Sequence, residues 1–378
     1  MPTLKQKILV AIVCCFSISP AFSEVPAVIH SEGMKLKLEQ VAKGLGVAWG
    51  LCFITHNQLL VTERSGAIKR IDIDNGDIVQ LKNLPEVLAQ GQGGMLDVAV
   101  SPDYKKTGWI YFTYVKDVDI DSEGVTVLAR AKLVGETFKN WQELLVTKSQ
   151  SDESHHFGSR ITFDTQGHVF FGVGDRGVRK NAQDLTNHAG SIMRLNLDGS
   201  VPSDNPYSTN KKWLPEVWSI GHRNPQGMAY DAENKRLWSI EHGPRGGDEI
   251  NLIKPGANYG WPVISYGKEY WGPVAVGEGT HREGMDQPVK IYTPSIAPGS
   301  LLFYSGEGLS SWKGNLISGA LKLRHLNRIV LSQQGDVLKE ERLLEDLDER
   351  IRALALSSEG WLYFSTDSGK VFRLSRIE

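Results

Sequence analysis

Residues 59–72 read LLVTERSGAIKRID, and residues 361–374, near the other end of the chain, read WLYFSTDSGKVFRL. Both stretches run from an apolar strand pattern through a polar Ser-Gly turn into alternating apolar and basic residues. This pattern is typical of a β-hairpin, because strands have a side-chain period of two and tight turns carry glycine. The two ends of the chain share one structural unit, which predicts an internally repeated fold.

Four weaker copies of this hairpin lie between the first and the last. They pair residues 109–115 with 125–134, 168–174 with 190–197, 236–241 with 248–254, and 314–321 with 327–332. Successive hairpins begin roughly 50 to 80 residues apart, which is enough for a four-stranded sheet with a loop, and no helical pattern intervenes. The sequence therefore predicts an all-β fold, a six-bladed β-propeller of four-stranded antiparallel blades.

The N-terminal stretch 35–42, KLKLEQVA, alternates like a strand. We expect it to complete the last blade and close the ring, which also removes sheet edges that would otherwise pair with other chains. A two-domain β-sandwich is the alternative architecture, but the likeness of the first and last hairpins favours the ring. The ten tryptophans fit aromatic packing between blades, and none is assigned a catalytic role.

The first residues have the features of a secretory signal peptide. Lys5 and Lys7 precede the apolar run 8–16, and small residues precede Glu24. The run is too short to span a membrane, and no other stretch approaches the roughly 18 to 20 apolar residues that a span needs. We expect residues 1–23 to be removed, leaving a periplasmic protein whose residues 24–378 form one propeller domain.

Composition narrows the classes of partner. Once the signal peptide is removed, Cys52 is the one remaining cysteine, so an intramolecular disulfide is excluded and stability must come from burial. A formal net charge of −2 without a basic tract argues against a nucleic-acid surface. A small ligand or a soluble partner remains open, as do a monomer and a homodimer.

Residues 221–227, GHRNPQG, concentrate unlike polar groups around glycine and proline. Arg223, Asn224 and Gln226 alternate with residues that cannot build a long regular element, which fits a loop that offers a guanidinium and two amides to an anionic, oxygen-rich ligand. Each residue alone would be an ordinary solvated loop side chain. Their grouping favours the floor of a cofactor site.

A histidine pair, His155 and His156, opens the stretch HHFGSRITF, and the hairpin that follows ends in GVGDRG at 172–177. Histidine is well suited to accept a proton near neutral pH, and a carboxylate such as Asp175 can hold its tautomer and stabilise its cation. The alternative is a solvated histidine pair beside a turn aspartate.

The run GPRGGDEINLI at 243–253 is rich in oxygen ligands. Backbone carbonyls of Gly243 and Pro244, with Asp248, Glu249 and the turn at Tyr259, form a neighbourhood of the kind that calcium prefers. The alternative is a wide turn between two strands.

Basic residues recur near the C-terminus, at Lys322 and in the RIR of residues 350–352. Arg350 and Arg352 are two apart on an expected strand, so they share a face and could bind one anion. With Lys322 they could converge on several carboxylates. The alternative is a surface salt-bridge ladder with the neighbouring acids Asp346, Asp348 and Glu349. Gln92, in the glycine-rich loop 91–94, is a further hydrogen-bonding candidate.

Together these motifs resemble the soluble pyrroloquinoline-quinone (PQQ)-dependent glucose/sorbosone dehydrogenase family, especially its periplasmic aldose sugar dehydrogenase branch. The resemblance runs from about residue 43 to the C-terminus. It is carried by GHRNPQG, HGPRGGDEINL with NYGWP, AQDLTNHAGSIMRLNLDGSVPSDNP at 182–206, and the closing RIR.

The resemblance implies a propeller that oxidises aldose sugars at C1 to lactones by hydride transfer to PQQ and then passes electrons to an unidentified acceptor. The implied roles are His156 as general base with Asp175 as its partner, Arg223 beside the quinone carbonyl, and Asn224, Gln226, Lys322, Arg350 and Arg352 on quinone oxygens. Gly243 and Pro244 would hold the Ca²⁺ that polarises the quinone, Asp248, Glu249 and Tyr259 match a structural Ca²⁺ site, and Gln92 matches a sugar contact.

Two positions depart from the family pattern. His155 stands where the glucose-preferring branch has an acid that contacts sugar, so His155 is assigned to the substrate and glucose specificity is in doubt. Ser159 replaces the glycine usual before Arg160. Two other functions compete with this one. A non-catalytic secreted binding propeller would not need the three cations Lys322, Arg350 and Arg352, here called the cationic clamp. A calcium-dependent propeller lactonase would need side-chain carboxylates around an axial metal.

Overall fold

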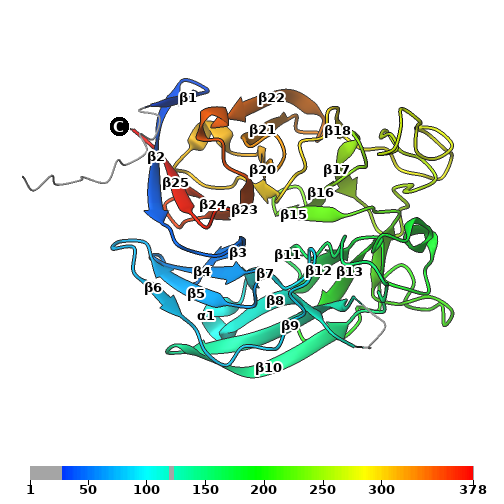
Figure 1. Cartoon of the computed structure of the whole chain (residues 1–378), viewed down its shortest axis with the longest axis horizontal. Helices are drawn as coiled ribbons and strands as arrows, with labels where there is room; N and C mark the ends of the chain where they lie inside the picture. Colours follow the sequence, from blue (N-terminus) through cyan, green and yellow to red (C-terminus); the bar gives the residue numbers. More distant parts are fainter. Residues whose placement is uncertain (1–27, 119–122, 378) are drawn as a thin grey trace, which may run out of the picture.

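The computed structural model describes residues 28–118 and 123–377. The signal peptide predicted over residues 1–23 lies outside these ranges, and its cleavage stays a prediction. Within them, all strands lie in six antiparallel sheets that follow one another around a ring in sequence order (Figure 1). The helices are one short turn, α1 (Tyr104–Thr107), and three 3₁₀ turns, η1 (Arg179–Gln183), η2 (Ser310–Trp312) and η3 (Glu345–Leu347).

Each blade begins with its innermost strand. The first contains β3 (Ala48–Phe53), β4 (Gln58–Glu63), β5 (Ile68–Asp72) and β6 (Ile78–Gln80). The second contains β7 (Met95–Val100), β8 (Trp109–Lys116), β9 (Val125–Val134) and β10 (Thr137–Val146). The third contains β11 (Ile161–Phe163), β12 (His168–Val173), β13 (Ser191–Asn196) and β14 (Val217–Ile220). The fourth contains β15 (Pro225–Asp231), β16 (Arg236–Glu241), β17 (Asp248–Ile253) and β18 (Lys290–Tyr292). The fifth contains β19 (Leu302–Phe303), β20 (Leu316–Gly319), β21 (Leu326–Leu331) and β22 (Val337–Leu343).

The sixth blade joins the two ends of the chain. From the inside outward it contains β23 (Ile351–Leu356), β24 (Leu362–Thr366), β25 (Val371–Arg376), β2 (Met34–Ala42) and β1 (Ile29–Ser31). β2 pairs antiparallel with β25, from Leu36 opposite Arg376 to Ala42 opposite Val371. This confirms the predicted closure, and β1 makes this sheet five-stranded where four strands were expected.

All six predicted hairpins are present, and the two that defined the repeat have turns of the expected kind. Gly66 between β4 and β5 has φ 108°, and Gly369 between β24 and β25 has φ 77°, in the region that favours glycine. A side chain at Gly369 would also collide with the carbonyl oxygen of Leu45. The Ser-Gly signal therefore marks positions where only glycine fits easily.

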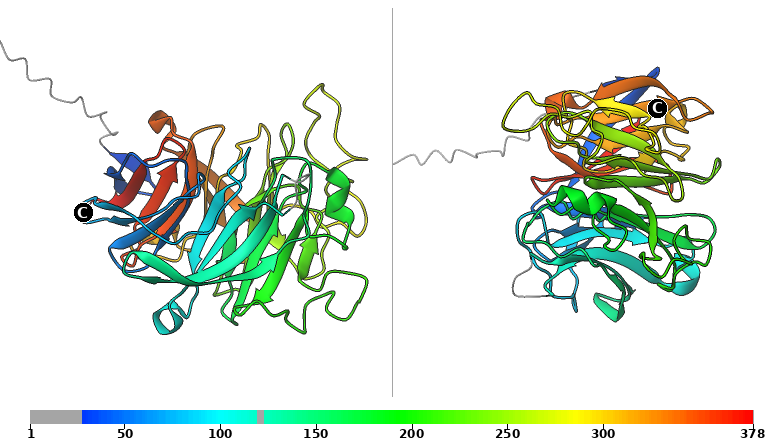
Figure 2. Two further views of the ribbon diagram at one scale, coloured as in Figure 1. Left: turned by 60° about the horizontal axis from the view of Figure 1, so that its bottom comes forward. Right: turned by 90° about the vertical axis from the view of Figure 1, so that its right-hand side faces the viewer.

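The apolar core lies mostly between neighbouring blades. One cluster packs Leu36 of the sixth blade with Trp312 and Leu326 of the fifth, and all three side chains are fully buried. Trp238 is also fully buried, as the predicted packing role requires, but Trp271 is 76% exposed in the long segment 254–289. That segment projects beyond the sheets (Figure 2).

Arg160 closes the middle of the ring. Its guanidinium donates to Asp97 Oδ1 of β7 at 2.8 Å and to the carbonyls of Gln226 (3.0 Å), Gly299 (2.6 Å) and Arg352 (2.8 Å), and it lies 3.9 Å from the centre of the Trp49 ring. One cavity of about 280 Å³ is lined by Arg160 itself, and a second of about 280 Å³ is lined by Gln226 and Arg352.

Among the described residues there is no helix with the length and apolar character needed to cross a membrane.

Candidate active site

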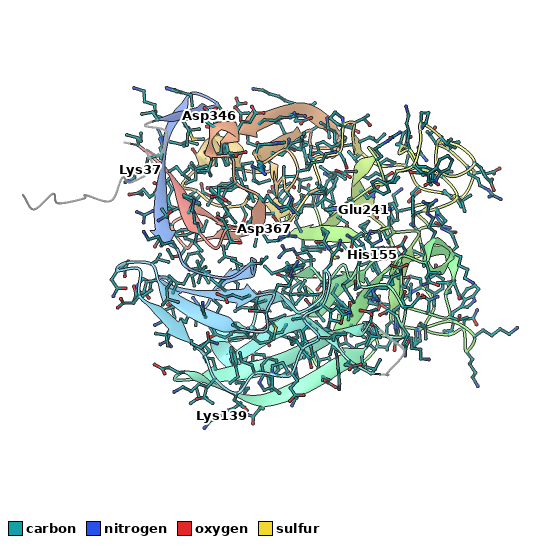
Figure 3. All side chains as sticks on the ribbon, viewed as in Figure 1. Lys37, Lys139, His155, Glu241, Asp346 and Asp367 are labelled. Carbon is teal, nitrogen blue, oxygen red and sulfur yellow. The ribbon has the colours of Figure 1, made fainter. Side chains whose placement is uncertain are left out.

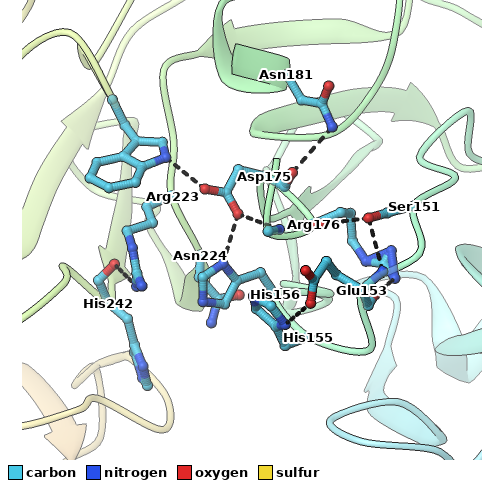
Figure 4. Close-up of polar contacts among 12 residues, drawn as sticks. Ser151, Glu153, His155, His156, Asp175, Arg176, Asn181, Arg223, Asn224 and His242 are labelled. Carbon is cyan, nitrogen blue, oxygen red and sulfur yellow. Dashed lines mark hydrogen bonds and ion pairs between the residues drawn. The ribbon is translucent and has the colours of Figure 1, made fainter. Parts of the chain in front are cut away.

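The centre of the site is a buried hydrogen bond between His156 and Asp175 (Figure 4). His156 Nδ1 lies 2.7 Å from Asp175 Oδ1, and Asp175, which follows β12, is only 1% exposed. His156 has φ 59°, a left-handed backbone conformation that histidine tolerates better than most residues. Its backbone N–H donates to Gln92 Oε1 at 3.0 Å, so the glycine-rich loop holds the histidine segment in place.

The surroundings of His156 favour its neutral form. Burial lowers the pKa of His156 to about 4, although the hydrogen bond to Asp175 acts in the opposite direction. Burial tends to raise the pKa of Asp175, but the bond to His156 and the charge of Arg223 outweigh it and hold that pKa below its usual value. An ionised carboxylate can only accept, so Nδ1 carries the proton and Nε2 is left with a lone pair. No other described residue forms a hydrogen bond with Nε2.

His155 lies beside His156 but takes no part in the hydrogen bond between His156 and Asp175. Its ring meets the His156 ring edge to face with centroids 4.4 Å apart, and its side chain is 35% exposed. Its Nδ1 is 3.4 Å from Glu153 Oε2. His155 thus lies at the open side of the site, where the substrate role predicted for it is physically feasible.

Arg223, Asn224 and Gln226 of GHRNPQG form the wall next to this pair. The Asn224 side-chain oxygen accepts the Gly158 N–H at 3.2 Å, and Gln226 Nε2 donates to the Gly158 carbonyl at 2.9 Å. Arg223 Nη1 donates to the Gly243 carbonyl at 2.8 Å, and the Arg223 backbone N–H donates to Glu241 Oε2 at 2.6 Å. Asn224 and Gln226 are therefore held against the segment that carries the histidine, and Arg223 is held against residues 241–243.

Asn224 and Gln226 line the second axial cavity, as do Phe157, which follows His156, and Gln92, which bonds the His156 backbone. Its wall includes Gln92, Asn224, Gln226, Arg350 and Arg352, so the structure brings together five site residues predicted from separate parts of the sequence. Figure 3 places His155, Glu241 and Asp367 around the inner part of the ring, whereas Lys37, Lys139 and Asp346 lie at its periphery.

Arg350 and Arg352 share one carboxylate, as two residues on one face can. Arg350 Nε lies 2.7 Å from Asp367 Oδ2, and Arg352 Nε and Nη2 lie 2.8 and 2.9 Å from its two oxygens. Burial tends to raise the pKa of Asp367, but the two arginines hold it below its usual value. The partner is thus Asp367 from the β24–β25 turn.

The alternative interpretation, a surface salt-bridge ladder between these arginines and the neighbouring acids, is wrong. Asp348 pairs with Arg324, and Glu349 pairs with Lys370. The third predicted cation, Lys322, is exposed, and its ammonium forms no hydrogen bond or ion pair with any residue in the described ranges.

The oxygen-rich run 243–249 also folds into one place. A cavity of about 20 Å³, enough for one water-sized or ion-sized occupant, is lined by Gly243, Pro244, Glu241, Glu249 and Tyr259. Burial and the neighbouring Glu241 charge raise the pKa of Glu249 to about 8. The carboxylate, carbonyl and hydroxyl oxygens of this lining are of the kind that a hard cation prefers.

Two predicted metal residues are already engaged. Asp248 accepts the Gly243 N–H at 2.9 Å and the Ala297 N–H at 2.8 Å and also bonds Ser295, so its carboxylate organises the loop. The Tyr259 hydroxyl donates to the Leu252 carbonyl at 2.6 Å. Within the described ranges, three or more His, Cys, Asp or Glu side chains nowhere gather in a metal-binding arrangement, so an ion here would depend on backbone carbonyls as well.

Three site residues escaped the sequence analysis: Glu241, Asp367 and Trp261. Glu241 accepts His222 Nδ1 at 3.0 Å and the Arg223 N–H, and Trp261 Nε1 donates to Asp175 Oδ2 at 2.7 Å. Trp261 and Asp175 are 86 positions apart, so nothing in either local pattern marks the pair. A signal was available only for Glu241, which directly precedes the glycine-rich run.

A six-bladed propeller with a buried histidine–aspartate pair beside an axial cavity of amides and arginines defines a propeller enzyme with its site on the ring axis. The model of the family "Glucose / Sorbosone dehydrogenase" matches residues 45–373, and the chain belongs to that family.

Individual relatives extend over nearly the whole chain. It is 35% identical to the aldose sugar dehydrogenase YliI of Escherichia coli over 97% of each chain. The crystal structure of the soluble aldose sugar dehydrogenase of E. coli in the apo-form superimposes with a TM-score of 0.86 at 32% identity, covering 90% of this chain and all of that one. The PQQ-bound form of aldose sugar dehydrogenase from Streptomyces coelicolor gives 0.74 at 26% identity, covering 94% and 100%.

Proposed function

We propose that this chain is a periplasmic quinoprotein that oxidises aldose sugars at C1 to lactones, with PQQ as cofactor and Ca²⁺ as its metal. The observation that carries the proposal is the neutral His156, held by Asp175 beside the axial cavity with Nε2 free. The names of the relatives, aldose sugar dehydrogenase and quinoprotein glucose dehydrogenase, support the same reaction class.

The residues around the cavity suit a tricarboxylic quinone. Arg350, Arg352 and Lys322 supply positive charge for carboxylates, and Asn224 and Gln226 supply amide hydrogen bonds. Asp367 holds the two arginine side chains in the cavity wall, so the cationic face is ordered before a ligand arrives. Arg223 would stabilise negative charge that develops on the quinone oxygen.

The proton chemistry falls to His156. Its Nε2 accepts the proton of the anomeric hydroxyl, and the Asp175 carboxylate stabilises the resulting imidazolium. Gln92 holds the His156 backbone, and with His155 it borders the space proposed for the sugar. When bound, PQQ accepts the hydride that leaves C1, and Ca²⁺ on Gly243 and Pro244 polarises the quinone.

The remaining assignments belong to the same proposal. Glu249 with Asp248 and Tyr259 would border a structural Ca²⁺ site. An unidentified acceptor would take electrons from the reduced cofactor, and we expect no role for nucleic acid or a membrane span. A lactonase would need an axial cage of side-chain carboxylates, and the described residues contain no such cluster.

Reconstitution tests the proposal. Purified protein freed of cofactor should be inactive, and PQQ together with Ca²⁺ should restore oxidation of aldoses to a dye. PQQ alone after chelation should restore little activity, and a panel of aldoses would reveal the preferred sugar. Sugar oxidation that survives chelation and needs no added or bound quinone would overturn the proposal.

A further inference from the structure

Both oxygens of the Asp175 carboxylate accept hydrogen bonds, but only Oδ1 contacts His156. Oδ1 accepts His156 Nδ1 at 2.7 Å and the Gly177 N–H at 2.9 Å. Oδ2 accepts the indole N–H of Trp261 at 2.7 Å. The indole thus fixes the rotation of the carboxylate about its Cβ–Cγ bond, and this rotation determines where Oδ1 lies.

Trp261 is itself held rigidly by the neighbouring blade. Its backbone N–H donates to the Gly221 carbonyl at 3.0 Å, and its carbonyl accepts Gln183 Nε2 at 2.7 Å. Its side chain is 6% exposed and packs against Ala182 and Val276. The indole is therefore a fixed donor from the segment after β17, aimed at a carboxylate that follows β12.

We infer that Trp261 is a positioning residue, which acts through Asp175 to hold the His156 imidazole in the orientation and tautomer that a base requires. A neutral donor suits this task, because it satisfies the second carboxylate oxygen without adding a positive charge that would weaken the pull on His156. The inference concerns the proposed sugar oxidation and rests on that function.

Other charged groups face this pair and stay in place when the indole N–H is removed. His155 and Arg223 act on His156, and Arg176 and Arg179 act on Asp175. The Arg223 and Arg179 guanidinium carbons also lie 5.3 and 5.5 Å from the centre of the Trp261 ring. A Phe at position 261 keeps an aromatic ring next to these arginines, so the substitution isolates the hydrogen bond.

Removing the donor should make the pair more basic. A buried carboxylate that loses a hydrogen bond to its charged form binds a proton more readily, whether the proton resides on Asp175 or on His156. With Trp261→Phe, protonation of the pair therefore moves to higher pH. We also expect kcat to fall about tenfold, the equivalent of losing one hydrogen bond to a charged group, with KM for the sugar changed less.

The matched control is Trp238→Phe in the same blade. Trp238 is fully buried, and its Nε1 has no hydrogen-bond partner among the described residues, so this change removes the same atoms without breaking a bond. Thermal unfolding of both variants reports any loss of packing. The control should keep the parent pH profile and kcat.

The decisive measurement is an NMR titration of ¹⁵N-histidine-labelled protein without cofactor, in which the His156 signal is the one lost in His156→Gln. The inference expects the His156 titration to move to higher pH in Trp261→Phe, and the acidic limb of kcat/KM to move with it in protein reconstituted with PQQ and Ca²⁺. An unmoved titration, or an equal shift in Trp238→Phe, would overturn it. If the parent protein shows no sugar oxidation, the proposed function fails, while the titration still decides the role of Trp261.

Discussion

His156 and His168 make the same contact in different surroundings. Each places Nδ1 2.7 Å from an aspartate oxygen, and their side chains are 12% and 13% exposed. Arg194 Nη2 lies 3.0 Å from His168 Nε2, whereas His156 Nε2 has no partner in the described part of the chain. A histidine–aspartate pair is thus not by itself a site. His156 differs because its Nε2 is unbonded within the described residues and because Phe157 and Gln92, which adjoin it, line the axial cavity.

This contrast gives a mutational test of the base. His156→Ala should lower kcat about 10²- to 10⁴-fold, the usual loss for a general base, while PQQ still binds. His168→Ala should leave kcat of the reconstituted protein within about twofold, because its pair lies outside the cavity. His155→Ala should mainly change the relative kcat/KM among sugars. A larger loss from His155→Ala than from His156→Ala with every sugar would mean that the base is assigned wrongly.

The pKa of His156 sets the acid limit of activity. The pKa is lowered to about 4 by burial, so the base is neutral and active above that pH and becomes protonated as the pH falls through it. The profile of kcat/KM should therefore stay level from neutral pH to about 5 and fall near pH 4. A profile that falls near pH 6.5 would indicate a solvated histidine instead. The residual activity of His156→Ala should lack this limb.

Replacing Arg350 and replacing Arg352 should have different effects on the stability of the protein. Arg350 is 45% exposed and Arg352 only 11%, although both bind Asp367. Either change to Met should weaken PQQ affinity about tenfold to a hundredfold, the equivalent of one charge-assisted hydrogen bond. Arg350→Met should alter the stability of the cofactor-free protein by about 0–1 kcal/mol. Arg352→Met should cost about 1–3 kcal/mol more, because the Asp367 carboxylate loses its two-bond partner.

Melting each arginine variant with and without PQQ separates binding from stability. A smaller cofactor-induced rise in Tm is the expected result for both. Equal rises in the parent protein and both variants would remove these arginines from the site.

At the scale of elements, the closing strand β2 carries a clear alternation between core and solvent. Leu36 and Leu38 are 0% and 5% exposed, and the lysines on either side of Leu36 point outward. The strand lies between β25 and β1 in the sixth sheet, and it belongs to the opposite end of the chain from β23, β24 and β25. Its apolar face therefore supports ring closure directly.

Truncating that face should weaken the whole ring. Leu36→Ala should lower the free energy of unfolding by about 2–5 kcal/mol, because it leaves a cavity against Leu326 and Trp312. Lys35→Ala, one position away on the solvent face, should change it by less than about 0.5 kcal/mol. Denaturant unfolding of both variants measures the difference. Equal effects would show that β2 adds little to the stability of the ring.

The elements were predictable where local chemistry decides them. The Ser-Gly turns at 65–66 and 368–369 and the alternation of 35–42 identified hairpins and closure, since each signal lies within a few residues. The extra strand β1 was missed because three residues are too few to show a period. At the site, the residues in unusual local sequence were found, whereas Asp367 and Trp261 were missed. Their partners lie at least 15 positions away, and only the folded ring brings them together.

At the scale of the whole molecule, Arg160 connects three blades that are not neighbours in the ring. Its bonds reach Asp97 in the second blade, Gln226 in the fourth and Arg352 in the sixth. Burial lowers the pKa of Arg160, and the Asp97 charge acts against this shift. Gln226 and Arg352, two of the three residues whose carbonyls it bonds, also line the second axial cavity, so one guanidinium supports both the ring and the cavity wall.

Arg160→Met should therefore be costly. It leaves the buried Asp97 carboxylate without its charged partner, and we expect a loss of about 3–5 kcal/mol in unfolding free energy. The control is the half-buried Arg236, whose guanidinium makes one solvent-exposed bond to a carbonyl, and Arg236→Met should change stability by less than about 0.5 kcal/mol. Thermal and denaturant unfolding without cofactor measure both. Similar losses of unfolding free energy in the two variants would mean that the buried bonds of Arg160 stabilise the ring no more than one surface bond does.

The pairing of β2 with β25 has a topological consequence. Because strands from both ends of the chain lie side by side in one sheet, the described structure is a circle whose seam lies inside a blade rather than between two blades. A chain cut in a surface loop of another blade and rejoined between 376 and 29 by a short linker would keep every sheet, but its seam would lie at a different blade. Each blade would then occupy a different position along the chain. The residues around the axis would keep the same neighbours.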